Sequence, residues 1–229
     1  MKGAWCVLNY AHACNIRMTG FNIWRDPLHS PCFRLLVQKM LELYWRHGVL
    51  ADIPYEDIPL IAELACHHDI GKQELPHSVI YKPGPLTPEE NVIMRSHTLL
   101  GAYMVEDVYR GRHTPPEAIY LYEICRHHHE RWDGGGYPDG LQRDEIPCYV
   151  QIIGLADALD ALLTKRSYRP ALKIGDAISL IIKGGCGVFS PQIRAIFDYA
   201  GDDLVKSVYD PEQIRAGQEP KAYCTHPSS

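Results

Sequence analysis

Long apolar segments are missing from this sequence, because none of its hydrophobic runs approaches the roughly 20 residues that a membrane-spanning helix requires. The N-terminus offers only Lys2 before a mildly apolar stretch broken by polar residues, a poor match to a signal peptide. The 8 cysteines include no Cys-x-x-Cys pair, and a chain of 229 residues does not need disulfides to fold. We therefore expect reduced cysteines, a cytoplasmic location and no membrane association.

Basic residues are also scarce, with 23 Lys and Arg against 28 Asp and Glu, a net charge of -5 and a pI near 6.2. Binders of nucleic acid polymers or anionic membranes normally carry a basic surface, so neither is an expected partner. An anionic substrate would have to be met by local cations or metal ions. The sequence contains no Gly-x-Ser-x-Gly elbow, no P-loop and no Gly-x-Gly-x-x-Gly after a strand, which argues against the chemistries that those motifs serve.

What is present is apolar periodicity of the helical type, with no convincing alternating strand, so the fold class predicted is all-α. The hydrophobic content of 46% is enough for a core. We expect one large domain over residues 28–216, an N-terminal extension over 1–27 that packs on or flanks it, and a polar C-terminal tail over 217–229. Helices are predicted at residues 28–45, 55–72, 88–109, 115–129, 149–164, 174–183 and 191–199.

Residues 131–147 interrupt the helical pattern, because glycines and prolines there forbid a continuous helix. The segment has to be a long ordered loop, with room for at most a short hairpin. Loops of this length inside a compact domain are uncommon and are usually functional.

Histidines and acids gather at the ends of the predicted helices. His68 and Asp69 end one apolar helix, His127, His128 and His129 end another, and Asp157 lies within a third. A buried His or Asp is costly unless it is hydrogen-bonded or binds a metal, so each alone is compatible with a structural role. Together, imidazoles and carboxylates in this number suit iron, manganese, cobalt or zinc.

The motifs form one ordered series between about residues 29 and 200. They are His68-Asp69-Ile70-Gly71-Lys72, Ser96-His97-Thr98, His128-His129-Glu130, Gly136-Tyr137-Pro138, Asp157-Ala158-Leu159-Asp160, Arg166-Ser167-Tyr168-Arg169 and Phe189-Ser190-Pro191. This series resembles the HD-GYP phosphodiesterases, a subgroup of the HD metal-dependent phosphohydrolases. The resemblance implies an HD-domain-like helical bundle with a long loop around Tyr137. It also implies hydrolysis of a cyclic dinucleotide, first of all cyclic di-GMP, to the linear dinucleotide or to GMP.

The same resemblance implies two divalent transition-metal ions, iron or manganese before zinc, cobalt or nickel, with Asp69 bridging both. One ion would be held by His29, His68 and Asp157, and the other by His97, His128 and His129. Glu130 after the histidine run favours the pair 128 and 129 over 127 and 128. A plain helix-entry histidine is the alternative for His29, whose spacing to His68 is longer than usual in the family. Arg25 stands where some members have a glutamate that recruits a third ion, which favours two ions.

Substrate contacts are implied for the residues that border the expected metal site. Asp69 and Lys72 are the candidate catalytic residues, and the candidate substrate-binding residues are Lys72, Gly136, Tyr137, Pro138, Arg166 and Arg169. Two alternatives stay open, namely a solvated lysine at a helix end and a purely structural Ω-loop.

Two other functions also fit the motifs. The first is a degenerate HD-GYP module that binds a nucleotide or a signalling partner without turnover, and the second is a phosphohydrolase acting on another nucleotide. A diguanylate cyclase or other signalling protein bound through the loop, and a second copy of the chain, are the candidate protein partners.

Overall fold

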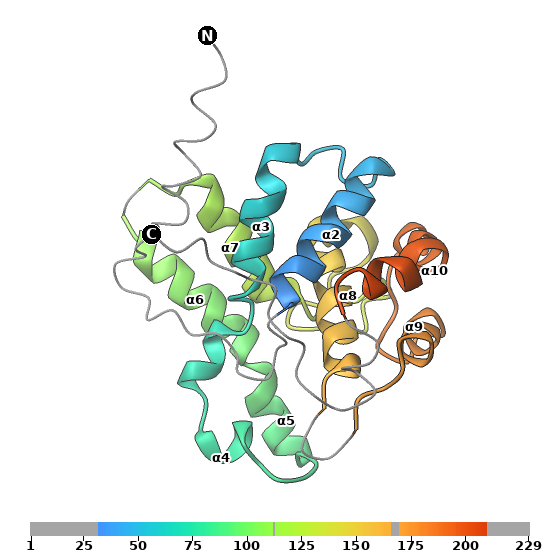
Figure 1. Ribbon diagram of the computed structural model, residues 1–229. Helices are drawn as coiled ribbons and strands as arrows, with labels where there is room; N and C mark the ends of the chain where they lie inside the picture. The colour runs from blue at the N-terminus through green and yellow to red at the C-terminus, as the bar shows by residue number, and fades with distance from the viewer. Residues whose placement is uncertain (1–31, 112, 166–169, 210–229) are drawn as a thin grey trace, which may run out of the picture.

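The computed structural model describes residues 32–111, 113–165 and 170–209. Within these ranges the chain is helical and contains no strand, which confirms the predicted all-α class (Figure 1). The α-helices are α2 (Phe33–Arg46), α3 (Ile58–Ala65), α4 (His77–Ile80), α5 (Pro88–Arg95), α6 (His97–Tyr109), α7 (Pro116–His127), α8 (Cys148–Leu163), α9 (Ile174–Ile182) and α10 (Pro191–Lys206). Three short 3-10 helices join them: η1 (Tyr55–Asp57), η2 (Ile70–Glu74) and η3 (Arg143–Glu145).

The helices pack as a series of neighbours. Helix α6 packs on α7, α7 on α3, α3 on α2, α2 on α8, and α8 on α9, which in turn contacts α10. In Figure 1 the pair α9 and α10 therefore lies on one side of the bundle, and α6 and α7 lie on the other. Helix α8 is buried on nearly all its faces, as expected of a helix that is apolar all round, so Asp157 is presented by the core.

The prediction of one continuous helix over residues 55–72 is wrong in one respect, because the helix is broken. The α-helical part ends at Ala65, and the backbone then makes i to i+3 hydrogen bonds up to Ile70. The side chain of His68 contributes to this change, because its Nδ1 donates to the Ala65 carbonyl oxygen at 2.7 Å. Asp69 consequently lies in a turn between α3 and η2, and not on a helix.

The helix predicted over residues 88–109 is also divided. Its start is as expected, since Thr87 and Glu90 form a capping box and Pro88 occupies the first turn. It breaks at Ser96, whose hydroxyl donates to the Ile93 carbonyl oxygen at 2.7 Å, and His97 begins α6. Helix α4 was not predicted, and α10 extends beyond its predicted end to Lys206.

Parts of the predicted domain organisation lie outside the described residues, including the extension 1–27 and the tail 217–229. A single antiparallel bridge between Asp133 and Gln142 is what the structure shows of a hairpin in the long loop. In the described part of the chain, every helix is too short or too polar to cross a membrane.

Candidate metal centre

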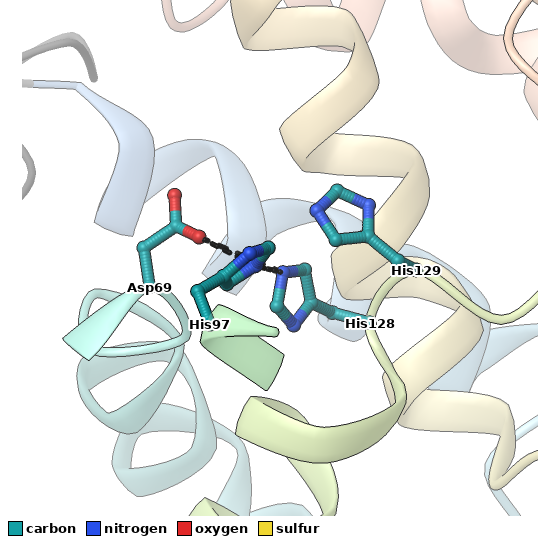
Figure 2. Close-up of side chains that lie close together, drawn as sticks. All are labelled: Asp69, His97, His128 and His129. Carbon is teal, nitrogen blue, oxygen red and sulfur yellow. Dashed lines mark hydrogen bonds and ion pairs between the residues drawn. The ribbon is translucent and has the colours of Figure 1, made fainter. Parts of the chain in front are cut away.

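Four side chains from breaks and ends of helices meet at one point. Asp69 comes from the turn before η2, His97 is the first residue of α6, and His128 and His129 follow the end of α7. Figure 2 shows the four side chains directed toward one another. One potential ligand atom from each lies within 4.8 Å of the others, and the first three residues are buried. The structure thus brings together four of the predicted ligands.

The contacts within this cluster are short. Asp69 Oδ1 lies 3.0 Å from His97 Nε2 and 3.8 Å from His128 Nε2. The two Nε2 atoms of His97 and His128 are 3.3 Å apart. Each of these imidazoles therefore directs the same ring nitrogen at the same carboxylate oxygen.

The contacts of the Nδ1 atoms determine the protonation state of the Nε2 atoms. His97 Nδ1 lies 2.7 Å from the Met94 carbonyl oxygen, and His128 Nδ1 lies 2.9 Å from that of Ile124. A carbonyl oxygen can only accept, so each Nδ1 carries the proton and each neutral ring turns a lone pair toward the cluster. Because the two Nε2 atoms are 3.3 Å apart, their lone pairs repel each other unless a cation lies between them. Metal-binding histidines are commonly oriented in this way, so the residues fit a divalent ion.

Burial favours the neutral form of the His128 and His129 rings. The pKa of His128 is held well below its ordinary value by burial first, and then by the neighbouring His129 and His68. Burial likewise lowers the pKa of His129, with His97 as the next cause. Neutral imidazole is the form that binds metal.

A second set of predicted ligands adjoins the first on the other side of Asp69. His68 Nε2 lies 3.2 Å from Asp69 Oδ2 and 3.8 Å from Asp157 Oδ1. Phe33 packs against the His68 ring, with a centroid separation of 5.5 Å. Asp69 thus presents one oxygen to each set, as a bridging carboxylate would. His29, the third ligand predicted for this set, lies outside the described residues, as does Arg25.

Gly71 allows the two ligand-bearing segments to approach each other. A Cβ atom at this position would stand 2.0 Å from the backbone oxygen of His97 and 2.5 Å from the backbone nitrogen of Gly101. Only glycine can occupy this position without moving α6 away from η2. The glycine of the His68-to-Lys72 motif thereby sets the distance between Asp69 and His97.

Lys72 is close to the cluster, as its spacing from Asp69 predicted. Its Nζ lies 2.5 Å from Asp69 Oδ2, and its side chain is only 15% exposed. It is thus not the solvated lysine of the alternative interpretation. A contact with substrate phosphate stays a prediction.

The long loop covers one side of the centre. Glu130 is buried, and its carboxylate accepts hydrogen bonds from the backbone nitrogens of Asp139, Gly140 and Leu141. A Cβ at Gly136 would stand 2.4 Å from the Glu130 Cα, so the loop folds back directly onto this segment.

The loop places Tyr137 against the metal-ligand candidates. The Tyr137 ring stacks on His129 with centroids 4.8 Å apart, and Pro138 follows it. Burial raises the pKa of the Tyr137 hydroxyl, so the ring stays neutral. The loop thus supports the cluster as well as bordering it. Arg166 and Arg169, which were also predicted to contact substrate, lie outside the described residues.

Two residues near the site had no predicted role beyond packing. His127 lies between carboxylates, with Nδ1 2.6 Å from Glu123 Oε2 and Nε2 3.0 Å from Asp139 Oδ2. Although burial alone would lower the His127 pKa, these carboxylates raise it. A charged imidazole between two carboxylates suits a residue that links α7 to the loop, and not a metal ligand. Arg95 places its guanidinium carbon 4.9 Å from the Tyr137 ring centroid. No local motif marks either role.

Comparison with known proteins matches residues 58–190 to the family described as HD domain. A protein of Vibrio cholerae named "Probable cyclic di-GMP phosphodiesterase" is 39% identical over 131 residues, which is 57% of this chain and 30% of that protein. A "Cyclic di-GMP phosphodiesterase" of Thermotoga maritima is 38% identical over 130 residues, 57% of this chain and 34% of that protein. The Vibrio cholerae "3'3'-cGAMP-specific phosphodiesterase 2" is 36% identical over 165 residues, 71% of this chain and 28% of that protein.

The chain therefore spans about a third of the length of these relatives, between 28% and 34%. Among solved structures it is similar to Bd1817, "a HDG"Y"P protein from Bdellovibrio bacteriovorus", with a TM-score of 0.56 and 18% identity, over 87% of this chain and 60% of that one. That structure bears on the fold alone. Together these findings confirm the family resemblance that the motifs indicated.

Proposed function

The chain belongs to the HD domain family, and we propose that it is a metal-dependent phosphodiesterase that hydrolyses a cyclic dinucleotide, with cyclic di-GMP as the first candidate. The observation that carries the proposal is the cluster of Asp69, His97, His128 and His129, whose ligand atoms lie within 4.8 Å of one another. Cyclic di-GMP and 3'3'-cGAMP are both named for relatives of 36% to 39% identity, so both are candidate substrates.

The ligand assignment divides the site about Asp69. We assign His97, His128 and His129 to one ion and His68, Asp157 and His29 to the other, with iron or manganese preferred. Such a pair of ions, when bound, would activate a water molecule and offset the charge that develops on the phosphate. The carboxylate of Asp69 lies between the two sets of imidazoles and would bind both ions.

The remaining residues would hold the substrate. Lys72 stands beside Asp69 and would turn its ammonium group to a non-bridging phosphate oxygen when the ions neutralise that carboxylate. Tyr137, between Gly136 and Pro138, would form one wall beside the reacting phosphate. Arg166 and Arg169 are proposed to reach the base or phosphate by forked hydrogen bonds or stacking.

We place the activity in the cytoplasm, where reduced cysteines are stable. The candidate macromolecular partners are a signalling protein such as a diguanylate cyclase, bound through the loop 131–147, and a second copy of the chain.

The test is incubation of the manganese- or iron-loaded protein with cyclic di-GMP and with 3'3'-cGAMP, followed by chromatographic separation of the products. We expect the linear dinucleotide or the mononucleotide from at least one substrate. A fully loaded protein that binds cyclic di-GMP without converting it would instead support the non-catalytic binding module. Turnover of another nucleotide alone would move the activity to the related phosphohydrolases.

A further inference from the structure

Arg95 places a positive charge close to the candidate metal centre. It ends α5, two residues before His97, and its side chain is exposed. Its guanidinium carbon lies 4.9 Å from the centroid of Tyr137, and the same ring stacks on His129 at 4.8 Å. Two ring contacts thus connect this exposed cation to a predicted metal ligand.

Contact with the tyrosine ring orients the Arg95 side chain. A guanidinium held near an aromatic ring keeps its N–H donors free to form hydrogen bonds in its own plane. In the described ranges, no protein group accepts a hydrogen bond from this side chain and no carboxylate pairs with it. The group is therefore positioned by Tyr137 while its donors remain available to a ligand.

Among the described residues, the other cations near the centre have partners within the protein. Lys72 pairs with Asp69, and Arg126 makes a two-point contact with Asp139. Arg131 donates to the carbonyl oxygens of Cys186, His128 and Glu130. Arg126 and Arg131 are held by these contacts and Lys72 is assigned to the phosphate being cleaved, whereas the contact of Arg95 with Tyr137 leaves the arginine charge unneutralised.

A cyclic dinucleotide needs such a group, given the proposed function on which this inference rests. It contains two phosphodiesters, of which one is cleaved while the other keeps its negative charge. The protein has a net charge of -5, so this second phosphate must be met by a local cation. We propose that Arg95 is a substrate-binding residue that contacts the phosphate not being cleaved.

Two substrates and three variants test this assignment. Cyclic di-GMP has the second phosphate, whereas bis(p-nitrophenyl) phosphate has a single phosphodiester and no base. Arg95→Gln removes the charge with little change in length. Arg95→Lys keeps the charge but loses the paired N–H donors of the guanidinium. The matched control is Arg110→Gln, which removes an exposed arginine at the end of α6 whose guanidinium pairs with Asp107.

The expected result is a loss confined to the larger substrate. In Arg95→Gln, KM for cyclic di-GMP should rise about tenfold, because a charged hydrogen bond is lost. In Arg95→Lys the same KM should rise less. Metal content and the kinetics with bis(p-nitrophenyl) phosphate should match those of the parent. Arg110→Gln should match the parent on both substrates.

Several outcomes would overturn the assignment. Equal losses on both substrates would show that Arg95 acts on the metal centre, and unchanged kinetics on both would show that it does not bind substrate. In either case the parent is active, so the proposed function stands. A metal-loaded parent inactive on both substrates, or active on bis(p-nitrophenyl) phosphate alone, would remove the cyclic dinucleotide function and the role of Arg95 with it.

Discussion

Substitution of Glu130 by glutamine should loosen the loop that supports His129. The Glu130 carboxylate is 3% exposed. Its Oε1 accepts hydrogen bonds from the backbone nitrogens of Asp139 at 2.7 Å and Gly140 at 3.1 Å, and its Oε2 accepts from that of Leu141 at 3.1 Å. A glutamine has the same shape but one acceptor oxygen, so its amide nitrogen would face at least one of these donors.

The loss in free energy of unfolding follows from that mismatch between donors and acceptors. Hydrogen bonds to a charged acceptor contribute about 1.5–3 kcal/mol each, and a buried donor left without an acceptor costs a similar amount. If the amide oxygen keeps the two donors that Oε1 has now, Glu130→Gln should lower the free energy of unfolding by about 2 kcal/mol. For a domain of this size, that corresponds to a Tm lower by about 4–8 °C.

Thermal unfolding followed by circular dichroism would measure this effect, with a chelator present so that loss of metal does not contribute. The matched control is Glu145→Gln, because Glu145 is exposed and accepts from one backbone nitrogen, that of Gln142, at 2.8 Å. We expect the control to lose less than about 1 kcal/mol. If the two variants unfolded at the same temperature, the argument that Glu130 organises the loop would be refuted.

Four further substitutions test the metal centre and the packing around it. Asp69→Ala should abolish turnover and reduce the bound metal measured by mass spectrometry, whereas Lys72→Ala should keep its metal and lose about tenfold or more in kcat/KM; the reverse pattern would contradict the roles assigned. Gly71→Ala should destabilise the fold by about 3 kcal/mol in urea unfolding, because its Cβ would overlap the first backbone carbonyl of α6, and an unchanged midpoint would refute this packing. A hydrogen bond from Arg126 holds the pKa of the Asp139 carboxyl below its ordinary value, so this stabilisation is present above the unfolded-state pKa and is lost as pH falls through the folded-state pKa. Asp139→Asn should therefore lower Tm near neutral pH by the equivalent of about 1 kcal/mol, and the difference from the parent should shrink on acidification; a difference independent of pH would argue against the pair.

The sequence predicts the helices well where apolar periodicity is strong, as in α8 and α9. It misses the breaks after Ala65 and at Ser96, because neither is marked by proline or glycine at the break itself. The first break depends on the bond from His68 to the Ala65 carbonyl and on the close seating of Gly71 against α6. The first is a local side-chain contact and the second is a tertiary one, and together they override local helix propensity.

The candidate site could be named from residue types and their order, but its geometry could not. His128 and Asp69 come from segments far apart in the sequence, and only packing places their side chains 3.8 Å apart. The positions of Arg95 and Glu130 were beyond prediction for the same reason. Each depends on how the loop after the histidines folds back, and no local pattern encodes that path.

The central claim is that this cluster hydrolyses a cyclic dinucleotide through bound metal. The most direct measurement is the rate of cyclic di-GMP hydrolysis by one protein sample before chelation, after removal of its metal, and after addition of manganese or iron under anaerobic conditions. We expect hydrolysis to disappear with the metal and to return with it, in proportion to the metal bound. Hydrolysis that persists in the metal-free protein, or a reloaded centre that leaves cyclic di-GMP intact, would contradict it.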